Sequence, residues 1–182
     1  MKQRIITILT DFGLQDPYVA SMKGVILSIN PDVQLIDISH EIGKFNIQEA
    51  AFKLAASVPY FTPSTIHLVV VDPGVGSDRK PLIVLTRHYF FIGPDNGVLS
   101  LAAEQDGIKR IIEIQNKNFI RKPVSNTFHG RDLFAPVAAY VAKRVALKKF
   151  GPNIRKMVKL KIPEVVISHN EIKGKILYID GF

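Results

Sequence analysis

The chain has 182 residues, of which 47% are hydrophobic and 22% charged, so its composition is globular and excludes a disordered or fibrous protein. Its length fits one domain, or one domain and a fragment. No apolar run approaches the ~18 residues of a membrane-spanning helix. The absence of cysteine excludes disulfides and thiolate chemistry. We therefore expect a cytoplasmic protein without membrane contacts.

The net charge of +8 is concentrated towards the C-terminus. Residues 141–182 carry 10 of the 24 basic side chains but 3 of the 16 acidic ones. A nucleic-acid surface is one interpretation of this excess. A solvated helix face with its connector is the other, and it is favoured because no interleaved aromatic residues offer bases a stacking surface. We therefore do not expect nucleic acid as a partner.

Strands and helices are predicted to alternate as far as residue 150. Apolar runs predict strands at residues 4–10, 33–38, 65–71, 81–86, 89–92 and 109–114. Helical spacing of apolar residues predicts helices at 18–29, 47–58, 97–104 and 133–149, the last being the longest. This alternation indicates an α/β fold, a layered and mostly parallel sheet flanked by helices.

The domain division follows from the same pattern. Residues 1–150 are expected to form the α/β catalytic domain, and residues 151–173 a connector containing proline and lysine. A further strand is predicted at residues 174–179. Because a lone strand cannot form a domain, it either docks on the first domain or begins a second one. We interpret residues 174–182 as the start of a truncated, β-rich C-terminal domain.

Polar motifs follow three predicted strands, at the ends where α/β sheets bind ligands. In the first, Asp11 and Asp16 follow strand 4–10. A carboxylate at a strand end can accept the hydroxyls of a ribose, or can bind a divalent metal. The alternative is that Asp16 caps the next helix. In another of these motifs, Asn96 lies in an Asp-Asn-Gly sequence that is typical of a structural turn.

The remaining motif contains Asp72, two glycines and Arg79. The glycines permit close backbone approach to a ligand, and Arg79 can fold back over the loop. No Lys-Ser/Thr pair opens a helix, so this is not a phosphate loop. A turn with a surface ion pair is the alternative. His129 precedes the longest predicted helix and is the most site-like of the five histidines, although it could instead cap the helix or pack in the core.

Asp72, Arg79 and His129 could converge on a water molecule. The carboxylate can accept a proton, the arginine can stabilise developing hydroxide, and the histidine can orient the water or shuttle the proton. Without cysteine or a Gly-x-Ser-x-Gly motif, a covalent hydrolase is not favoured. These residues favour a hydrolase or transferase acting on a small ribose-bearing molecule. A metal-dependent phosphoesterase is the alternative, with a mixed oxygen and nitrogen site at Asp11, Asp16, Asp72, His129 and Asp132.

Together, the motifs at residues 10–19, 71–79, 93–97 and 128–132 resemble those of the S-adenosylmethionine hydroxide adenosyltransferases, the hydrolytic branch of the group that contains fluorinase and chlorinase. The resemblance implies hydrolysis of S-adenosylmethionine to adenosine and methionine by water attack at the ribose C5′, without metal or cofactor. It assigns the catalytic roles to Asp72, Arg79 and His129. The halogenating relatives carry tyrosine in place of Asp72, and a carboxylate there would repel a halide, so hydrolysis is favoured over halogenation.

The resemblance also implies a set of substrate-binding residues. Asp11 matches the residue that binds the ribose, and Asp16 and Tyr18 correspond to positions near the methionine end. Phe45 falls where the halogenases carry a large aromatic residue that packs on the ligand. Asn96 is a further candidate.

Family members are trimers that bind the ligand between the first domain of one subunit and the second domain of its neighbour. We therefore expect a homotrimer whose site lies at the subunit interface. Asp180 matches an aspartate that contacts the methionine amino group. If 182 residues are the whole chain, most of the adenine pocket is missing. A non-catalytic remnant that binds adenosyl compounds or nucleosides is then the alternative.

Overall fold

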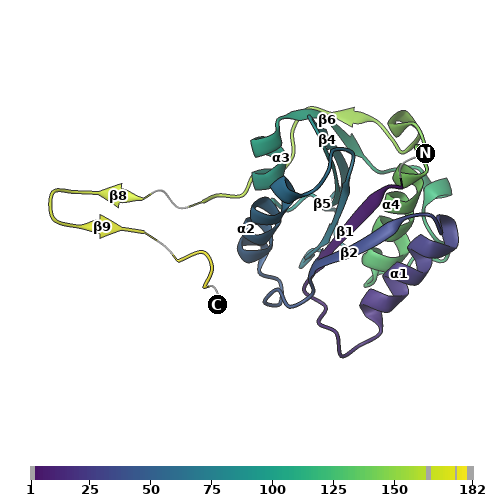
Figure 1. The fold of residues 1–182 in the computed structure, drawn as a ribbon, viewed down its shortest axis with the longest axis horizontal. Helices are drawn as coiled ribbons and strands as arrows, with labels where there is room; N and C mark the ends of the chain where they lie inside the picture. The colour runs from purple at the N-terminus through teal and green to yellow at the C-terminus, as the bar shows by residue number, and fades with distance from the viewer. Residues whose placement is uncertain (1–2, 163–164, 175, 180–182) are drawn as a thin grey trace.

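The computed structural model describes residues 3–162, 165–174 and 176–179. Its body is a seven-stranded sheet in the order β2-β1-β3-β5-β4-β6-β7, with helices on both faces (Figure 1). The strands are β1 (Ile5–Thr10), β2 (Gln34–Ser39), β3 (Ile66–Val70), β4 (Pro81–Thr86), β5 (Phe90–Pro94), β6 (Ile108–Glu113) and β7 (Asn153–Ile154). The helices are α1 (Tyr18–Ile29), α2 (Ile47–Ser57), α3 (Ser100–Asp106) and α4 (Ala135–Ala142). The predicted α/β fold is confirmed.

Strands β2, β1, β3 and β5 run parallel, whereas β4, β6 and β7 join the sheet antiparallel. β1 and β3 pair from Ile6 with Ile66 to Thr10 with Val70, so both strands end at the same level. The segments that follow them therefore emerge side by side at one edge of the sheet. This register brings the predicted Asp11 and Asp72 motifs together.

Two apolar layers hold the sheet between its helices. Helices α1 and α4 cover one face of the sheet, and α2 and α3 cover the other (Figure 1). Ile6 and Ile8 belong to the apolar cluster on the first face, whereas Leu9 belongs to the cluster on the second. The alternation follows from the two-residue period of a strand. β3 is buried along its whole length. It contains His67, whose pKa burial lowers to about 3, with Nδ1 2.8 Å from Thr7 Oγ1.

The helix predicted at residues 133–149 differs from the observed one. A π-helical turn (Gly130–Phe134) leads into α4, which ends at Ala142. Arg144 adopts a positive φ of 62°, a conformation that terminates a helix. A separate 3₁₀ turn at Leu147–Lys149 follows. The apolar spacing through Val145 predicted a longer helix because it does not encode this backbone reversal.

Two 3₁₀ turns, Val58–Tyr60 and Lys117–Phe119, complete the elements of the body. The chain beyond residue 150 stays attached to it at first, because β7 pairs with β6. Val158 N also donates to Asp95 Oδ1 and Leu160 N donates to Ser100 Oγ. Residues 153–160 therefore lie on the α/β body, past the predicted boundary at 150.

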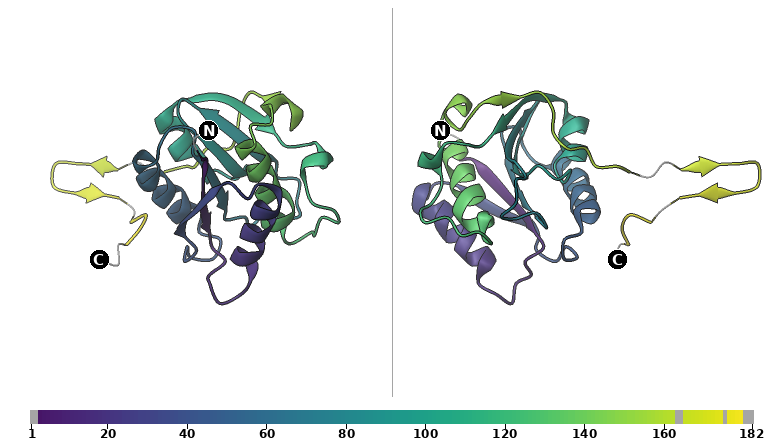
Figure 2. Two further views of the ribbon diagram at one scale, coloured as in Figure 1. Left: turned by 45° about the vertical axis from the view of Figure 1, so that its right-hand side comes forward. Right: turned by 180° about the vertical axis from the view of Figure 1, so that it is seen from behind.

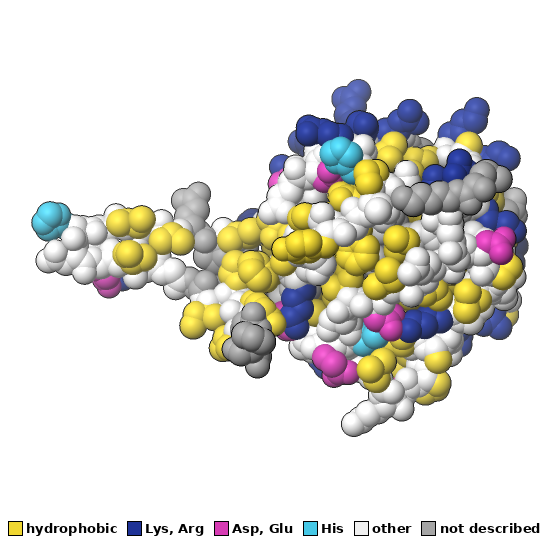
Figure 3. Space-filling model, viewed as in Figure 1, with side chains coloured by type: hydrophobic (Ala, Val, Ile, Leu, Met, Phe, Trp, Pro, Cys, Tyr) yellow, Lys and Arg dark blue, Asp and Glu magenta, His cyan; other side chains and the backbone are white. Residues whose placement is uncertain are grey.

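The strand predicted at residues 174–179 is absent from the described residues of that range. Instead, β8 (Val166–Ile167) and β9 (Ile172–Lys173) pair antiparallel in a small second sheet. In the C-terminal arm (residues 165–174 and 176–179), the β8–β9 hairpin projects from the body (Figures 1 and 2), and the arm carries hydrophobic side chains on its surface (Figure 3). Further along the arm, the ring of Tyr178 lies 5.8 Å from the Phe52 ring of α2. In the part of the chain that is described, no helix is long and apolar enough to cross a membrane.

Candidate active site

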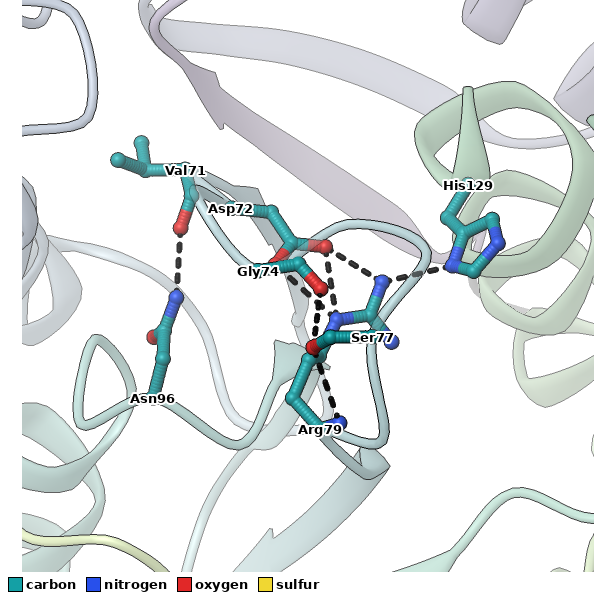
Figure 4. Close-up of polar contacts among 7 residues, drawn as sticks. All are labelled: Val71, Asp72, Gly74, Ser77, Arg79, Asn96 and His129. Atoms are coloured by element: carbon teal, nitrogen blue, oxygen red, sulfur yellow. Dashed lines mark hydrogen bonds and ion pairs between the residues drawn. The ribbon is translucent and has the colours of Figure 1, made fainter. Parts of the chain in front are cut away.

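Asp72 and Arg79 form a nearly buried ion pair at the edge of the sheet (Figure 4). Arg79 folds back across its loop, and its Nε lies 3.0 Å and 2.9 Å from the two carboxylate oxygens of Asp72. Gly74 leaves room for this path, since a Cβ there would lie 3.2 Å from Arg79 Cγ. Ser77 Oγ fixes the turn by donating to Gly74 O and accepting from Arg79 N.

His129 joins this pair through the same guanidinium group. Arg79 Nη2 lies 2.7 Å from His129 Nδ1, and a guanidinium can only donate. Nδ1 is therefore the acceptor, which assigns the hydrogen of the neutral ring to Nε2. Burial and then the charge of Arg79 lower the pKa of His129, against the raising effects of Asp72 and Asp132. His129 is therefore neutral at pH 7.

The two loops that carry these residues are in direct backbone contact. Gly76 has a positive φ of 81°, and a Cβ there would lie 2.7 Å from Asn126 O. The ring of Phe134 lies 5.2 Å from the Arg79 guanidinium carbon. Within the described residues, Nη1 of Arg79 makes no hydrogen bond. The site therefore holds a fixed cation with one nitrogen available to an incoming oxygen atom.

A second ion pair braces the loop that carries His129. Asp132 is fully buried, and Arg131 donates to both of its oxygens, at 2.7 Å and 2.9 Å. Burial alone would raise the pKa of Asp132, but hydrogen bonds from Arg131 and the Ser125 N–H outweigh it and lower this pKa. Sequence reasoning considered Asp132 only as a metal ligand. The adjacent Arg-Asp pair before a helix was the available signal of this bracing role.

Asp11 is held at the end of β1 by the loop before α2. Its side chain is buried, and Oδ2 accepts a hydrogen bond of 2.8 Å from Phe45 N. Lys44 Nζ donates to the carbonyl of Asp11 at 2.6 Å. Phe45 has a positive φ of 61°, and the residue is 61% exposed. Oδ1 of Asp11 makes no hydrogen bond within the described residues, so one carboxylate oxygen is open to a ligand.

An aromatic cluster connects the Asp11 and His129 loops, and sequence reasoning missed most of it. Phe12, Tyr18 and Phe128 have ring centroids 5.2–6.1 Å apart, all in edge-on arrangements. Gly130 allows this packing, because a Cβ there would lie 3.3 Å from the Phe12 ring. A phenylalanine in each of the two motifs was the available signal.

The other predicted residues have different surroundings. Asn96 donates to Val71 O at 2.9 Å and accepts from Val98 N, so its amide ties neighbouring loops together. Asp16 is exposed and does not cap α1, whose N-cap is Pro17, so the capping alternative is wrong. Asp180 lies outside the described residues.

The mixed metal site that was considered as an alternative is not assembled in the described part of the chain. There, no three His, Asp or Glu side chains form a group that could hold a metal ion. Asp72 and Asp132 are instead each paired with an arginine. This arrangement does not favour a metal-dependent phosphoesterase.

Comparison with known proteins adds independent information. The sequence profile of the family described as SAM hydroxide adenosyltransferase N-terminal domain matches residues 6–151. A protein from Methanocaldococcus jannaschii named (R)-S-adenosyl-L-methionine hydrolase is 44% identical over 98% of this chain and 64% of its own length. A protein of the same name from Salinispora tropica is 37% identical, over 97% of this chain and 69% of its own length.

A solved structure shows the same architecture. The crystal structure of an uncharacterized conserved protein from Thermotoga maritima superposes with a TM-score of 0.91 and 41% sequence identity. The match covers 97% of this chain and 68% of that chain. The chain thus spans about two thirds of the length of the relatives that it matches.

Proposed function

The chain belongs to the S-adenosylmethionine hydroxide adenosyltransferase family, and from this premise we propose that it hydrolyses S-adenosyl-L-methionine to adenosine and L-methionine. The observation that carries the proposal is the contact of Asp72, Arg79 and His129 at the end of β3. These residues combine a proton acceptor, a fixed cation and a neutral imidazole. That combination suits activation of a water molecule.

The nucleophilic water would lie beside the carboxylate of Asp72, to which it donates a hydrogen bond. Arg79 Nη1 is a free donor within the described residues, and Asp72 Oδ1 keeps a lone pair beside its bond from Nε. The water oxygen attacks the ribose C5′ while the C5′–S bond breaks and its electron pair passes to sulfur. The water proton moves to Asp72 and then to solvent. Arg79 stabilises the charge that develops on the attacking oxygen.

The remaining residues would bind and orient the substrate. Asp11 Oδ1 is open to a ribose hydroxyl, while the Phe45 N–H fixes the other oxygen. The exposed rings of Phe45 and Tyr18 would pack against the ligand, with Tyr18 and Asp16 towards its methionine end. The sulfonium leaves as a neutral thioether, so the reaction needs no general acid.

The oligomeric state and the cellular compartment of the protein form part of the same proposal. We expect a homotrimer in which the neighbouring subunit completes the substrate pocket, together with Asp180. The absence of cysteine fits the reducing cytoplasm. Light scattering on the purified protein measures the assembly. A monomer at every concentration that supports turnover would contradict the shared site.

The experiment is a chromatographic assay of adenosine and methionine from S-adenosylmethionine, with and without EDTA. Equal release of both products in the two samples is expected. The Asp72→Asn variant should lose at least about 100-fold in rate, because it lacks the proton acceptor. Asp78→Asn, which changes an exposed aspartate in the same loop, is the matched control.

Loss of turnover with EDTA would support the metal-dependent alternative. Ligand-dependent thermal stabilisation without products would support the binding remnant.

A further inference from the structure

A groove of about 540 Å³ lies between α1, α4 and the segment that joins β6 to the His129 loop. Its apolar wall includes Val25, Ile29 and Tyr140. Gly24 forms part of its α1 side, and a Cβ at that position would meet nothing within 4 Å. The volume falls within the range of roughly 300–1,000 Å³ that is typical of small-molecule sites.

Two guanidinium groups give one end of this groove a positive charge. Arg121 and Arg131 both line it, and Arg131 is paired with the buried Asp132. Arg121 is exposed and forms no ion pair in the described part of the chain, although its charge also acts on Asp132. Two positive charges, those of Arg121 and Arg131, are therefore opposed by the single negative charge of Asp132. Lys143 Nζ donates to the backbone carbonyl of Ile29 at 3.0 Å, and this places a third cation near the groove.

We propose that this groove binds a small organic anion. Its carboxylate, sulfonate or phosphate group lies against Arg121 and Arg131, and its apolar body lies along Val25, Ile29 and Tyr140. Charge complementarity selects an anion, because the groove has a net positive charge, and the apolar wall selects a ligand with a carbon body over a bare inorganic ion. Neither feature depends on the reaction proposed above.

Gly24 supplies a variant that blocks the groove without disturbing the fold. In Gly24→Leu, the new side chain extends into open space on the groove side of α1. In the matched control Gly24→Ala, the single methyl group leaves most of the groove free. Both changes replace a glycine inside a helix by a better helix former, so α1 is expected to stay intact. Arg121→Gln separately removes the unpaired cation.

The test is a fluorescence titration with two probes that share an apolar ring system. Anilinonaphthalene sulfonate carries the anionic group, whereas N-phenylnaphthylamine lacks it. We expect saturable binding of the sulfonate and about 10-fold weaker binding of the neutral probe. Gly24→Leu and Arg121→Gln should each weaken sulfonate binding about 10-fold, and Gly24→Ala should stay within about twofold of the parent chain.

Several outcomes would overturn the proposal. Unchanged sulfonate binding in Gly24→Leu and Arg121→Gln would place the probe elsewhere, and equal binding of the neutral probe would remove the role of charge. Complete displacement by inorganic phosphate at constant ionic strength would indicate a simple anion site. The C-terminal arm also exposes apolar side chains, so Ile167→Ser with Ile172→Ser is tested in parallel. Loss of all binding in that double variant would assign the probe to the arm.

Discussion

The candidate active site buries charged side chains, whereas the C-terminal arm exposes apolar ones. Asp72 and Arg79 are almost fully buried, and each bonds a partner within the described body of the chain. In the arm, Val166, Ile167 and Ile172 are 59%, 74% and 72% exposed. Buried charges are stable only when paired, so the site geometry is tightly specified. The β8–β9 hairpin of the arm buries none of these three side chains, and the arm contacts the body through the ring of Tyr178, which lies 5.8 Å from that of Phe52.

This difference separates two parts of the proposed function. The groups that would activate water are positioned by contacts within the α/β body alone. The groups that would surround the substrate are more exposed, as Tyr18 and Phe45 show at 46% and 61%. Changes in the loops at the sheet edge should therefore affect chemistry strongly, whereas changes in the arm should hardly affect the folding of the body.

Replacement of Arg79 should have the largest effect. Arg79→Lys keeps one positive charge but cannot bond Asp72 and His129 together through a planar fork. We expect adenosine release to fall about 1,000-fold, as for the loss of a main transition-state donor. The exposed Arg110→Lys on β6 is the control and should stay within twofold. A threefold loss or less in Arg79→Lys would exclude this role.

Gly76→Ala should come next, through the contact between the two loops. The positive φ of Gly76 and the 2.7 Å approach of Asn126 O leave no space for a methyl group. We expect a loss of about 100-fold in turnover, because Arg79 and His129 move apart, and about 1–3 kcal/mol in unfolding free energy. Gly174→Ala in the arm, where a Cβ makes an ordinary 3.9 Å contact, should change neither quantity. Equal effects of the two substitutions would refute the importance of this contact.

The pH dependence of stability should distinguish the core from the arm. Burial lowers the pKa of His67 from 6.5 to about 3, so the unfolded chain takes up this proton first as the pH falls. The contribution of His67 to the free energy of unfolding is therefore greatest above pH 6.5, and it falls by roughly 1 kcal/mol per pH unit down to pH 3. Urea unfolding at pH 7.5 and pH 5 measures this change in unfolding free energy. His67→Gln should show a smaller pH dependence, and the exposed His169→Gln should match the parent. An undiminished slope in His67→Gln would contradict the assignment.

The smallest effect is expected in the arm itself. Ile167→Ser with Ile172→Ser should change the unfolding free energy of the body by less than about 0.5 kcal/mol, because both side chains are mostly exposed. Leu54→Ala in α2, where the side chain is fully buried, should cost about 2–5 kcal/mol and serves as the contrast. Urea unfolding at pH 7.5 measures both. A loss above 1 kcal/mol in the arm variant would mean that the arm stabilises the body.

Most of the secondary structure could be predicted from local patterns. The helix expected at 18–29 matches α1 (Tyr18–Ile29), and the strand expected at 81–86 matches β4 (Pro81–Thr86). The error at 133–149 arose where Arg144 reverses the backbone without an apolar signal. The expected strand at 174–179 failed because alternation does not identify a pairing partner. Short apolar segments in the arm pair with one another instead.

The positions of the candidate site residues at strand ends could be predicted from the sequence, whereas the contacts between them could not. Asp72, Arg79 and Asp11 stand beside strand ends, where the sequence itself marks turns with glycine and proline. The aromatic cluster around Phe12 was missed because each ring looks like an ordinary core residue in its own motif. The bracing role of Asp132 was missed for a different reason. Its partners depend on how the turn before α4 folds.

Local sequence patterns are sufficient to predict most of the strands and helices, the α/β class and the polar residues at the strand ends, because hydrophobic periodicity and turn chemistry are local properties. Which of those residues touch depends on how distant segments pack. Arg79 and His129 are 50 residues apart and meet because two loops pack against each other at Gly76. That contact also decides the tautomer of His129. A groove flanked by Arg121 and Arg131 likewise exists only once α1 and α4 are packed together, since long-range contacts are set by packing.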